Sequence, residues 1–422
     1  MYAIYNTLLS FCQKAIDLAA LIKIGKQRSK FWQFVQGHSN LLYKIENEFS
    51  LNDLPVIWFH ASSLGEFAAI RPIIKRLKST RECCVVTTFF SPSGIEALKQ
   101  SHPDIDYVFY LPLDTQKNVY RFLSILKPKC AVFSISEYWF NYLDALTKLD
   151  IKIYLISAYI PKNSIFFKWY GKMYRKILFS YNHIFASDKD SYCNLKGLGI
   201  LSSSICGDPL FDNAYMISRQ KWRNHIIDKF TKGEKVFIAG SINDEKDLQL
   251  ISRLANKHKD TKFIFVPHAI SEEILNRTIA SIQSKSKLYC ECNDETDFTE
   301  TQVLIIDFIG ALAYIYRYGT WVYIGGGFTP LLHSVIEPLV YGLPIAFGPQ
   351  IHRKPTPNIL IRLGIGQIVK SFNELDEWFS LLKNNSIELS RIKQAAINYV
   401  AENVGATESI VSKIENEIWS EK

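Results

Sequence analysis

The sequence predicts an α/β protein made of two doubly wound domains, each a parallel, Rossmann-like sheet covered by helices on both faces. Its 422 residues exceed what a single ordinary hydrophobic core holds. Short apolar runs alternate with helical runs in two series, which a polar helical segment separates. Open sheets of this kind bind ligands outside the carboxyl ends of their strands, so we expect the ligands in a crevice between the two domains.

The first series forms the predicted N-terminal domain, residues 36–215. Its expected strands are the runs 54–61, 82–90, 104–114, 130–136, 151–160 and 183–188. The first strand is followed by an amphipathic helix over 65–79. Another helix begins at Ser91 and Pro92, because serine and proline favour helix starts.

The second series forms the predicted C-terminal domain, residues 234–395. Its expected strands are the runs 235–241, 261–268, 303–307, 320–327 and 344–349. Each strand is followed by a loop with Gly, Pro, Ser or Asp and then by a helical run. The polar segment 216–233 is predicted to link the domains, and the last helix, 396–422, to cross back to the N-terminal domain.

The N-terminal segment 1–35 is predicted to be a helix that lies in a membrane interface. Apolar residues recur at roughly helical spacing from Tyr2 to Ile22, and Lys23, Lys26, Arg28 and Lys30 follow directly. Polar residues interrupt the run, so a full membrane crossing is not expected. The alternatives are a soluble helix packed on the body of the protein and, less favoured, a cleaved signal peptide.

Charge and cysteine usage limit the partners. The net charge of +8 suits an anionic membrane surface or a negatively charged small substrate, and without an arginine-rich run we predict no nucleic-acid partner. The 8 cysteines have no zinc-ligand spacing and are expected to be reduced and mostly buried. We therefore predict no metal and no cofactor.

The stretch "WFHASSLGEF" places a carboxylate, Glu66, between a strand and the start of a helix. Ser62, Ser63 and Gly65 surround Glu66, so the backbone there turns tightly and approaches a ligand closely. A carboxylate in such a place suits a general base that accepts a proton from a hydroxyl group. The alternative is a glutamate that only caps the helix.

Other unusual residues also follow predicted strands. Glu137 follows the run 130–136, and it suits either catalysis or the positioning of neighbouring groups. In the second domain such loop positions hold Ser241, His268 and the run Gly325–Gly327. The glycine run alone is a weak signal, because it also suits a tight connection.

A helix is expected from about His333, with Glu337 one turn inside it. Its free N–H groups would bind a phosphate or carboxylate, and Glu337 is spaced to bind ribose hydroxyls. The segment 160–179 interleaves aromatic residues with lysines, among them Lys168 and Lys172. It is predicted to meet a phosphate-bearing membrane surface, and the alternative is an amphipathic helix that packs against the sheet with its basic face in water.

Several motifs together resemble the 3-deoxy-D-manno-octulosonic acid (Kdo) transferases of lipid A assembly over nearly the whole chain. They occur in the family's order: "WFHASSLGEF", "SEYWFN", "CGDPLFD", "AGS", "VPH", "IDFIGAL", "YIGGGFTPLLHSVIEPLVYGLPIAFGP" and "VGATESI". The resemblance implies a GT-B glycosyltransferase that moves Kdo from CMP-Kdo to the 6′-hydroxyl of lipid IVA in lipopolysaccharide biosynthesis. It also implies that the protein acts at the cytoplasmic face of the inner membrane.

The resemblance assigns roles to matching residues. Glu66 matches the glutamate taken as general base, and Glu137 matches the acid of a second motif. By the resemblance, CMP is bound in the C-terminal domain at Ser241, Pro267, Gly326, Gly327 and Glu337. We expect His268, Gly325, His333 and Ser334 to bind the donor as well. From the tight turn around Glu66 and the aromatic and basic segment, we expect the acceptor-binding residues of the N-terminal domain to be Ser62, Ser63, Gly65, Lys168 and Lys172.

Two departures and two alternatives accompany this resemblance. Pro267 is followed directly by His268 where many members carry an intervening arginine, and Ser334 replaces a common asparagine.

Another GT-B glycosyltransferase that uses a uridine-linked sugar and a membrane lipid acceptor would share the crevice and the ribose-binding glutamate. A non-catalytic surface-binding protein would keep the aromatic and basic segment but need neither Glu66 nor Glu337.

Overall fold

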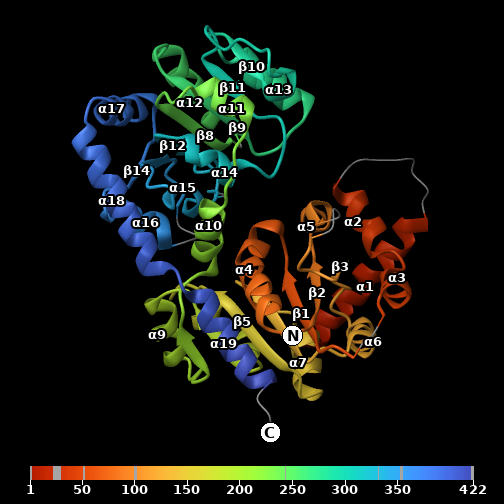
Figure 1. Ribbon diagram of the computed structural model, residues 1–422. Coiled ribbons are helices and arrows are strands. Elements are labelled where there is room, and N and C mark those ends of the chain that lie inside the picture. The colour runs from red at the N-terminus through yellow and green to blue at the C-terminus, as the bar shows by residue number, and fades with distance from the viewer. Residues whose placement is uncertain are drawn as a thin grey trace. The chain divides into compact units, whose positions relative to one another are not determined.

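The computed structural model describes residues 2–21, 30–50, 53–98, 102–242, 244–330, 332–351 and 355–419. The chain forms two compact units (Figure 1). Unit 1 consists of Met1–Asn213 together with Val404–Lys422, and unit 2 consists of Ala214–Asn403. The predicted α/β class with two parallel sheets is confirmed.

Unit 1 is built around a parallel sheet of seven strands in the order β3-β2-β1-β4-β5-β6-β7. The strands are β1 (Val56–Ala61), β2 (Cys84–Phe89), β3 (Tyr107–Tyr110), β4 (Cys130–Ser134), β5 (Lys152–Ala158), β6 (His183–Ala186) and β7 (Ser203–Ile205). The helices of the same unit are α1 (Tyr2–Leu21), α2 (Lys30–His38), α3 (Leu41–Glu48), α4 (Leu64–Thr80), α5 (Pro92–Leu98), α6 (Gln116–Leu126), α7 (Phe140–Lys148), η1 (Ile165–Phe167), α8 (Lys172–Leu178), α9 (Lys189–Gly197) and α19 (Ala406–Ile418), and α10 (Pro209–Arg219) begins in it.

Helices cover both faces of this sheet, so its central strands are buried on both sides. In β1 every residue is buried, and successive side chains enter opposite cores. Trp58 packs in the core with helices α3, α6 and α7, while Ile57 and Phe59 pack in the core with α4 and α19. His60 is therefore on the same face as Trp58, at the carboxyl end of the strand.

Helix α1 packs on unit 1 by one side only. The hydroxyl of Tyr2 donates to the side-chain carbonyl of Asn141 (2.7 Å), and the hydroxyl of Tyr5 donates to the carboxylate of Asp114 (2.6 Å). Another side of the helix exposes a stripe of large apolar residues, each between 60% and 72% exposed: Ile4, Leu8, Phe11 and Leu18. Within the described residues, no helix is long and apolar enough to span a bilayer.

Unit 2 repeats the architecture with a second seven-stranded parallel sheet in the order β10-β11-β9-β8-β12-β13-β14. Its strands are β8 (Val236–Ile242), β9 (Lys262–Pro267), β10 (Ser286–Leu288), β11 (Val303–Ile305), β12 (Trp321–Ile324), β13 (Ile345–Phe347) and β14 (Gly366–Ile368). Its helices are α11 (His225–Thr231), α12 (Glu245–Lys257), α13 (Glu272–Ala280), η2 (Tyr289–Glu291), α14 (Leu312–Ile315), η3 (Tyr316–Tyr318), α15 (Ile336–Leu339), α16 (Pro355–Arg362), α17 (Phe372–Lys383) and α18 (Ser386–Asn403).

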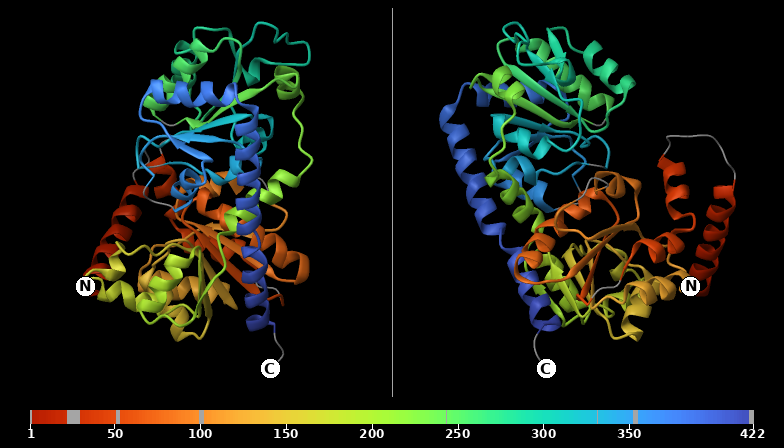
Figure 2. Two further views of the ribbon diagram at one scale, coloured as in Figure 1. Left: turned by 90° about the vertical axis from the view of Figure 1, so that its left-hand side faces the viewer. Right: turned by 45° about the vertical axis from the view of Figure 1, so that its right-hand side comes forward.

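The C-terminal segment returns to unit 1 as α19, which runs beside the sheet of that unit in both views of Figure 2. Ile410, Val411 and Ile414 are buried in the core that α4 shares with β1. The carboxylate of Glu408 accepts two hydrogen bonds from Arg76 of α4, at 2.8 and 3.0 Å. The predicted single helix over 396–422 is wrong, because Val404 and Gly405 separate α18 from α19 and Gly405 has φ 110°.

Two other predicted segments differ from the structure. The segment 216–233 is not a free linker, because α11 lies within it and buries Ile227 and Phe230 in unit 2. The segment 160–179 is not one helix but η1, a tight turn and α8. That turn requires a glycine at position 171, because a side-chain carbon at Gly171 would lie 1.9 Å from the carbonyl oxygen of Ile165.

Candidate active site

The candidate site of unit 1 lies at the carboxyl ends of two adjacent strands. β1 and β4 are paired, with His60 opposite Phe133, so the loops that follow these strands are neighbours. The loop after β1 leads into α4, whose third residue is Glu66. The loop after β4 contains Glu137, which is 4% exposed.

The backbone is strained just before Glu137. Ile135 has φ 64°, a left-handed conformation that is rare for a β-branched residue. Its N–H donates to the carbonyl of Ile156 (2.9 Å), and the N–H of Ser136 donates to the carbonyl of Ser134 (2.9 Å). Strain of this kind persists only where the surroundings fix it, and it commonly marks functional loops.

Glu137 is held from several directions. One carboxylate oxygen accepts a hydrogen bond from the backbone N–H of Ser62 (3.0 Å), and the other accepts one from the indole N–H of Trp139 (2.5 Å). The hydroxyl of Tyr181 donates to the backbone carbonyl of Glu137. Burial alone would raise the pKa of Glu137, but the neighbouring His60 and the two N–H donors lower this pKa below its ordinary value.

The pKa of Glu66 shifts in the opposite direction. Its burial, followed by the negative charge of Glu137, raises the pKa of Glu66 to about 7, although backbone hydrogen bonding from Ser62 and Ser63 and the nearby His60 oppose the shift. One carboxylate oxygen of Glu66 is buried and makes no hydrogen bond with any described residue. A carboxyl group that gains and loses a proton near neutral pH, with one oxygen uncommitted, suits a general base.

The structure brings together the predicted residues Ser62, Ser63, Gly65, Glu66 and Glu137. Lys168 and Lys172 are exposed in the η1–α8 segment and have no described contact with this group. That segment does pack on the Glu137 loop, because the rings of Tyr138 and Phe166 lie 5.2 Å apart.

Sequence reasoning missed His60, Trp139 and Tyr181, which line or support the site. His60 is fully buried, and Nε2 of its ring lies 3.5 Å from the carboxylate of Glu137. The available signal was a histidine at the carboxyl end of an otherwise apolar strand, next to the motif that carries Glu66.

The candidate site of unit 2 lies at the carboxyl ends of β9, β8 and β12, which are adjacent in the sheet. Ser241 is near the end of β8 and has φ 54°, in the left-handed region, where the pairing register with β9 also shifts. The N–H of His268 donates to the carbonyl of Ile242 (2.8 Å), and the N–H of His333 donates to the carbonyl of Gly325 (3.3 Å). The first bond joins the ends of β8 and β9, and the second lies within the loop after β12. The N–H of Gly325 donates to the carbonyl of Gly240 (2.9 Å), which joins that loop to β8.

The glycine run is required by close packing. A side-chain carbon at Gly325 would lie 2.2 Å from the carbonyl oxygen of Ser241, and one at Gly327 would lie 2.5 Å from the backbone nitrogen of Gly348. The N–H of Gly326 donates to the carboxylate of Asp247 (2.7 Å), which is fully buried and also accepts from the hydroxyl of Tyr323 (2.6 Å). Sequence reasoning missed Asp247, which fixes this turn.

The remaining predicted residues of unit 2 lie near the same loops. The rings of His268 and His333 are 4.2 Å apart. Glu337 is near Tyr316, because its negative charge contributes to the raised pKa of that phenol, whose main cause is burial. Pro267 ends β9, and Ser334 is half-buried in the loop before α15. The helix predicted from His333 is wrong: α15 begins at Ile336 and has 4 residues.

The sequence comparisons with known proteins point to Kdo transferases. Residues 29–213 match the family model described as 3-deoxy-D-manno-octulosonic-acid transferase (kdotransferase). The 3-deoxy-D-manno-octulosonic acid transferase of Aquifex aeolicus is 29% identical over 326 residues, 76% of this chain and 83% of the relative. That of Chlamydia muridarum is 25% identical over 346 residues, 78% of this chain and 79% of the relative. The chain is therefore similar to Kdo transferases over about three quarters of its length.

Solved structures support the fold of the chain. The UDP-GlcNAc 2-epimerase of Neisseria meningitidis, solved with UDP-GlcNAc, matches with a TM-score of 0.60 and 15% identity, and the match covers 85% of this chain and 98% of that one. At this identity the likeness concerns the fold alone. The predicted GT-B fold of two Rossmann-like sheets is confirmed.

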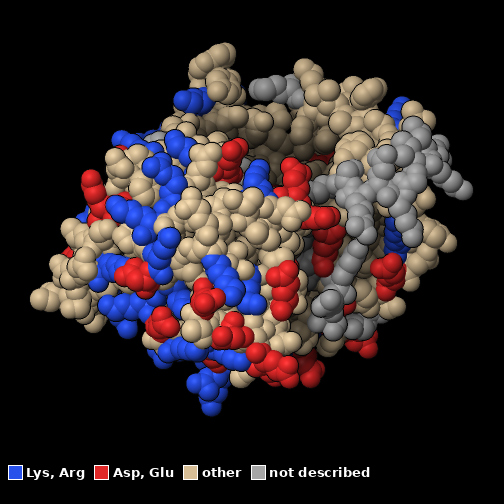
Figure 3. All heavy atoms as spheres, turned by 90° about the horizontal axis from the view of Figure 1, so that it is seen from above, with Lys and Arg blue, Asp and Glu red and all other residues tan. Residues whose placement is uncertain are grey.

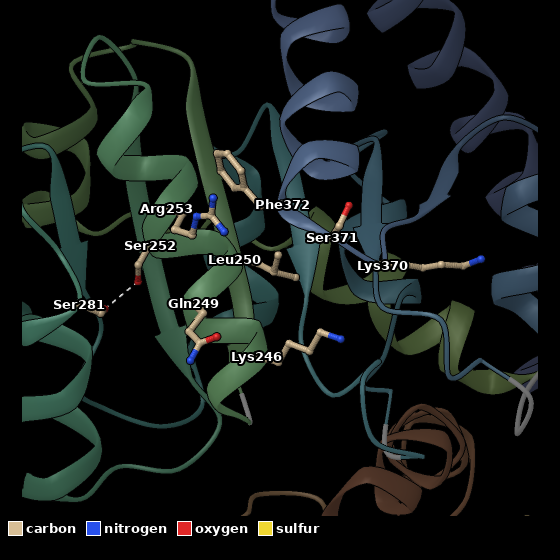
Figure 4. Close-up of a pocket in the computed structure, with 9 residues that line it drawn as sticks. All are labelled: Lys246, Gln249, Leu250, Ser252, Arg253, Ser281, Lys370, Ser371 and Phe372. Atoms are coloured by element: carbon tan, nitrogen blue, oxygen red, sulfur yellow. Dashed lines mark hydrogen bonds between the residues drawn. The ribbon is translucent and has the colours of Figure 1, made fainter.

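A separate cavity of about 450 Å³ occurs in unit 2 (Figure 4). It lies between α12 and the start of α17, where Arg253 stacks over the ring of Phe372 at 4.2 Å. Lys246 and Lys370 also line the cavity, but none of the predicted donor-binding residues does.

On the face in Figure 3, lysine and arginine side chains gather toward one side with carboxylates among them.

Proposed function

We propose that the protein transfers one or more Kdo units from CMP-Kdo to lipid IVA, beginning at its 6′-hydroxyl, in lipopolysaccharide core biosynthesis. The match of residues 29–213 to the Kdo transferase model and the similarity to the Aquifex aeolicus enzyme support the transferred sugar. The observation that carries the chemistry is the buried carboxyl group of Glu66, with a pKa of about 7 and one oxygen that no described residue hydrogen-bonds.

In this proposal Glu66 is the general base. The acceptor hydroxyl oxygen forms a bond to the anomeric carbon of Kdo while the bond from that carbon to the phosphate oxygen of CMP breaks. CMP leaves with the electron pair, and the hydroxyl proton passes to the carboxylate of Glu66. A hydroxyl group is a poor nucleophile until its proton is accepted in the transition state, which gives the carboxylate its role.

Glu137 supports this role from the neighbouring loop. Two N–H donors fix its carboxylate, and its negative charge contributes to the raised pKa of Glu66. We assign the acceptor contacts to the tight turn of Ser62, Ser63 and Gly65, which precedes Glu66. The exposed Lys168 and Lys172 suit the phosphate groups of a lipid disaccharide.

We assign the binding of CMP-Kdo to the three joined loops of unit 2. Ser241, Gly326 and Gly327 bring backbone close to a ligand, and Glu337 supplies oxygens for ribose hydroxyls. We assign to His268 and His333 hydrogen bonds to the leaving phosphate. The proposal needs no metal ion or cofactor, since each proton and charge is assigned to a residue of the chain.

We further propose that unit 1 works at the cytoplasmic face of the inner membrane. The exposed stripe of Ile4, Leu8, Phe11 and Leu18 on α1 suits the boundary between headgroups and acyl chains. Trp169 is 90% exposed in the η1–α8 segment, beside Lys168. An aromatic side chain next to cations is typical of segments that meet phosphate headgroups.

The direct test is to incubate the full chain with CMP-Kdo and lipid IVA and to weigh the lipid products. We expect a mass increase of one or more Kdo residues with release of CMP. Calorimetry that compares the affinities for CMP and UDP tests the alternative donor, because an enzyme that uses uridine-linked sugars would bind UDP more tightly than CMP. Unchanged lipid, with Kdo transfer absent at every pH, would contradict the proposal.

A further inference from the structure

His60 is a buried ionisable group that the proposed reaction does not use. It is 0% exposed, and its ring lies between the β2 residue Thr88 and the carboxylate of Glu137. Nδ1 lies 2.9 Å from the hydroxyl oxygen of Thr88 and 3.1 Å from the carbonyl oxygen of the same residue. Nε2 lies 3.5 Å from one carboxylate oxygen of Glu137, an ion-pair distance, and makes no hydrogen bond with any described residue.

The hydrogen bonds around Thr88 fix which nitrogen of His60 carries a proton. A carbonyl oxygen only accepts hydrogen bonds. The hydroxyl of Thr88 accepts from the indole N–H of Trp58 (2.8 Å) and donates to the carbonyl of Phe59 (3.4 Å). Both oxygens that face Nδ1 are therefore acceptors, so Nδ1 carries a hydrogen.

With Nδ1 protonated, the contact between Nε2 and Glu137 has two stable forms. Either Nε2 also carries a proton and faces an ionised carboxylate, or Nε2 is bare and faces a protonated carboxyl group. A bare nitrogen facing an ionised carboxylate would put two lone pairs together in a buried place. In both stable forms one proton lies between His60 and Glu137.

The surroundings of Glu137 favour the ionised carboxylate. Its two oxygens accept from the N–H groups of Ser62 and Trp139, and such donors stabilise the charged form. The other groups that face the pair are Glu66 from α4 and the aromatic rings of Phe133 and Trp139, each 5.9 Å from the ring of His60.

We propose that His60 is a positioning residue of the transfer reaction. It holds the proton that it shares with Glu137, so that Glu137 stays ionised. Glu66 then accepts the proton of the acceptor hydroxyl. The location of the proton follows from unit 1 alone. The consequence for turnover rests on the proposed role of Glu66.

The first experiment locates the proton without any substrate. The full chain is labelled with ¹⁵N at histidine, and the ring-nitrogen shifts are recorded at pH 7. The signal that disappears in His60→Gln is expected to show both nitrogens protonated. If that variant does not fold, Glu137→Gln identifies the signal by its displacement. A bare Nε2 in the wild-type protein at pH 7 would overturn the proposal.

The second experiment measures CMP release against pH. The positive charge of His60 opposes the raised pKa of Glu66, so His60→Gln should move the acid limb of the profile to higher pH. We expect the rate at pH 6.5 to fall about tenfold, as a displacement of one pH unit gives, and the rate at pH 9 to stay within about twofold.

His183→Gln is the matched control. His183 belongs to β6 in the same sheet, where its Nε2 lies 2.9 Å from the hydroxyl of Ser204, and its replacement should leave the profile in place. If His60→Gln lowers the rate by the same factor at every pH, its role is only structural and the proposal is wrong. If the wild-type protein releases no CMP, the proposed function fails while the NMR result still decides where the proton lies.

Discussion

At the scale of single residues, the properties of Glu66 come from its neighbours rather than from its type. Burial and the charge of Glu137 raise the pKa of Glu66 to about 7. The sequence predicted the position of Glu66, since a carboxylate between a strand and a helix is visible in the chain. His60 and Trp139 were not predicted, because their contacts with Glu137 depend on how β1 and the loop after β4 pair.

The pH dependence of turnover follows from this pKa. Glu66 accepts a proton only when it is ionised, so the rate of CMP release should fall as the pH falls through about 7 and should level off above pH 8. A pH–rate profile with saturating CMP-Kdo and lipid IVA measures this. A rate that stays constant down to pH 5 would show that a different group accepts the proton.

The raised pKa of Glu66 also affects the free energy of unfolding. The pKa of Glu66 lies above its ordinary value of 4.5, so ionisation of the folded protein costs free energy, and the cost grows from pH 4.5 to about pH 7. Glu66→Gln removes the cost. At pH 8 the variant should exceed the wild-type protein in free energy of unfolding by about 2 kcal/mol, after allowance for partial exposure, with a smaller difference at pH 4.5.

Urea unfolding of the two proteins at both pH values measures this difference. Glu82→Gln, at an exposed residue just after α4, makes the same chemical change and should give no pH-dependent difference. Equal stability of Glu66→Gln and wild-type protein at pH 8 would mean that Glu66 is not buried as described.

At the scale of elements, α1 and α7 depend on a buried carboxylate. Asp114 is fully buried, and its two oxygens accept from the backbone N–H groups of Asn141 (3.1 Å) and Tyr142 (2.9 Å) in the first turn of α7. Asp114 therefore caps α7 from another part of the chain. Because it also accepts from Tyr5, the same carboxylate fixes the orientation of α1.

The exposed stripe of α1 should bind membranes. Replacing Leu8 and Phe11 with serine removes two of its large apolar side chains, each worth about 2 kcal/mol when buried in an apolar phase. Binding to vesicles that contain anionic lipid should weaken at least about tenfold in a sedimentation assay. Ile387→Ser, at an 82% exposed residue of unit 2, is the control. Unchanged binding of the α1 variant would contradict the membrane role of the stripe.

The sequence predicted interior strands better than edge strands. The runs that became β1, β4, β8 and β12 are continuous apolar stretches, as expected for strands buried on both faces. β7, β10 and β14 were missed, because each has 3 residues and lies at or near a sheet edge, where little apolar pattern is required. The segment 216–233 was predicted to be helical and polar, but the burial of one face of α11 in unit 2 was not predicted, because only that face is apolar.

At the scale of the whole molecule, the chain forms two α/β units and ends by returning to the first. The family and the GT-B fold could be predicted, because ordered motifs occur across the chain and both strand series alternate with helices. The point of return could not be placed correctly, because α18 and α19 are similar in composition and only Gly405 marks the break.

The return of the chain should stabilise unit 1. Ile410 is 0% exposed in the core formed with β1 and α4, so Ile410→Ala should lower the free energy of unfolding by about 3 kcal/mol. Ile397→Ala, at a 41% exposed position of α18, makes the same change and should cost less than about 1 kcal/mol. Chemical unfolding measures both. Equal effects of the two changes would show that α19 is not part of the core of unit 1.

The most direct test of the central claim compares CMP release by wild-type protein, Glu66→Gln and Glu82→Gln with CMP-Kdo and lipid IVA. Removing the base should slow release at least about 100-fold, since general base catalysis contributes a factor of that order, while Glu82→Gln should match the wild-type protein. Circular dichroism confirms that the fold is retained. Wild-type rates in a folded Glu66→Gln protein would contradict the account.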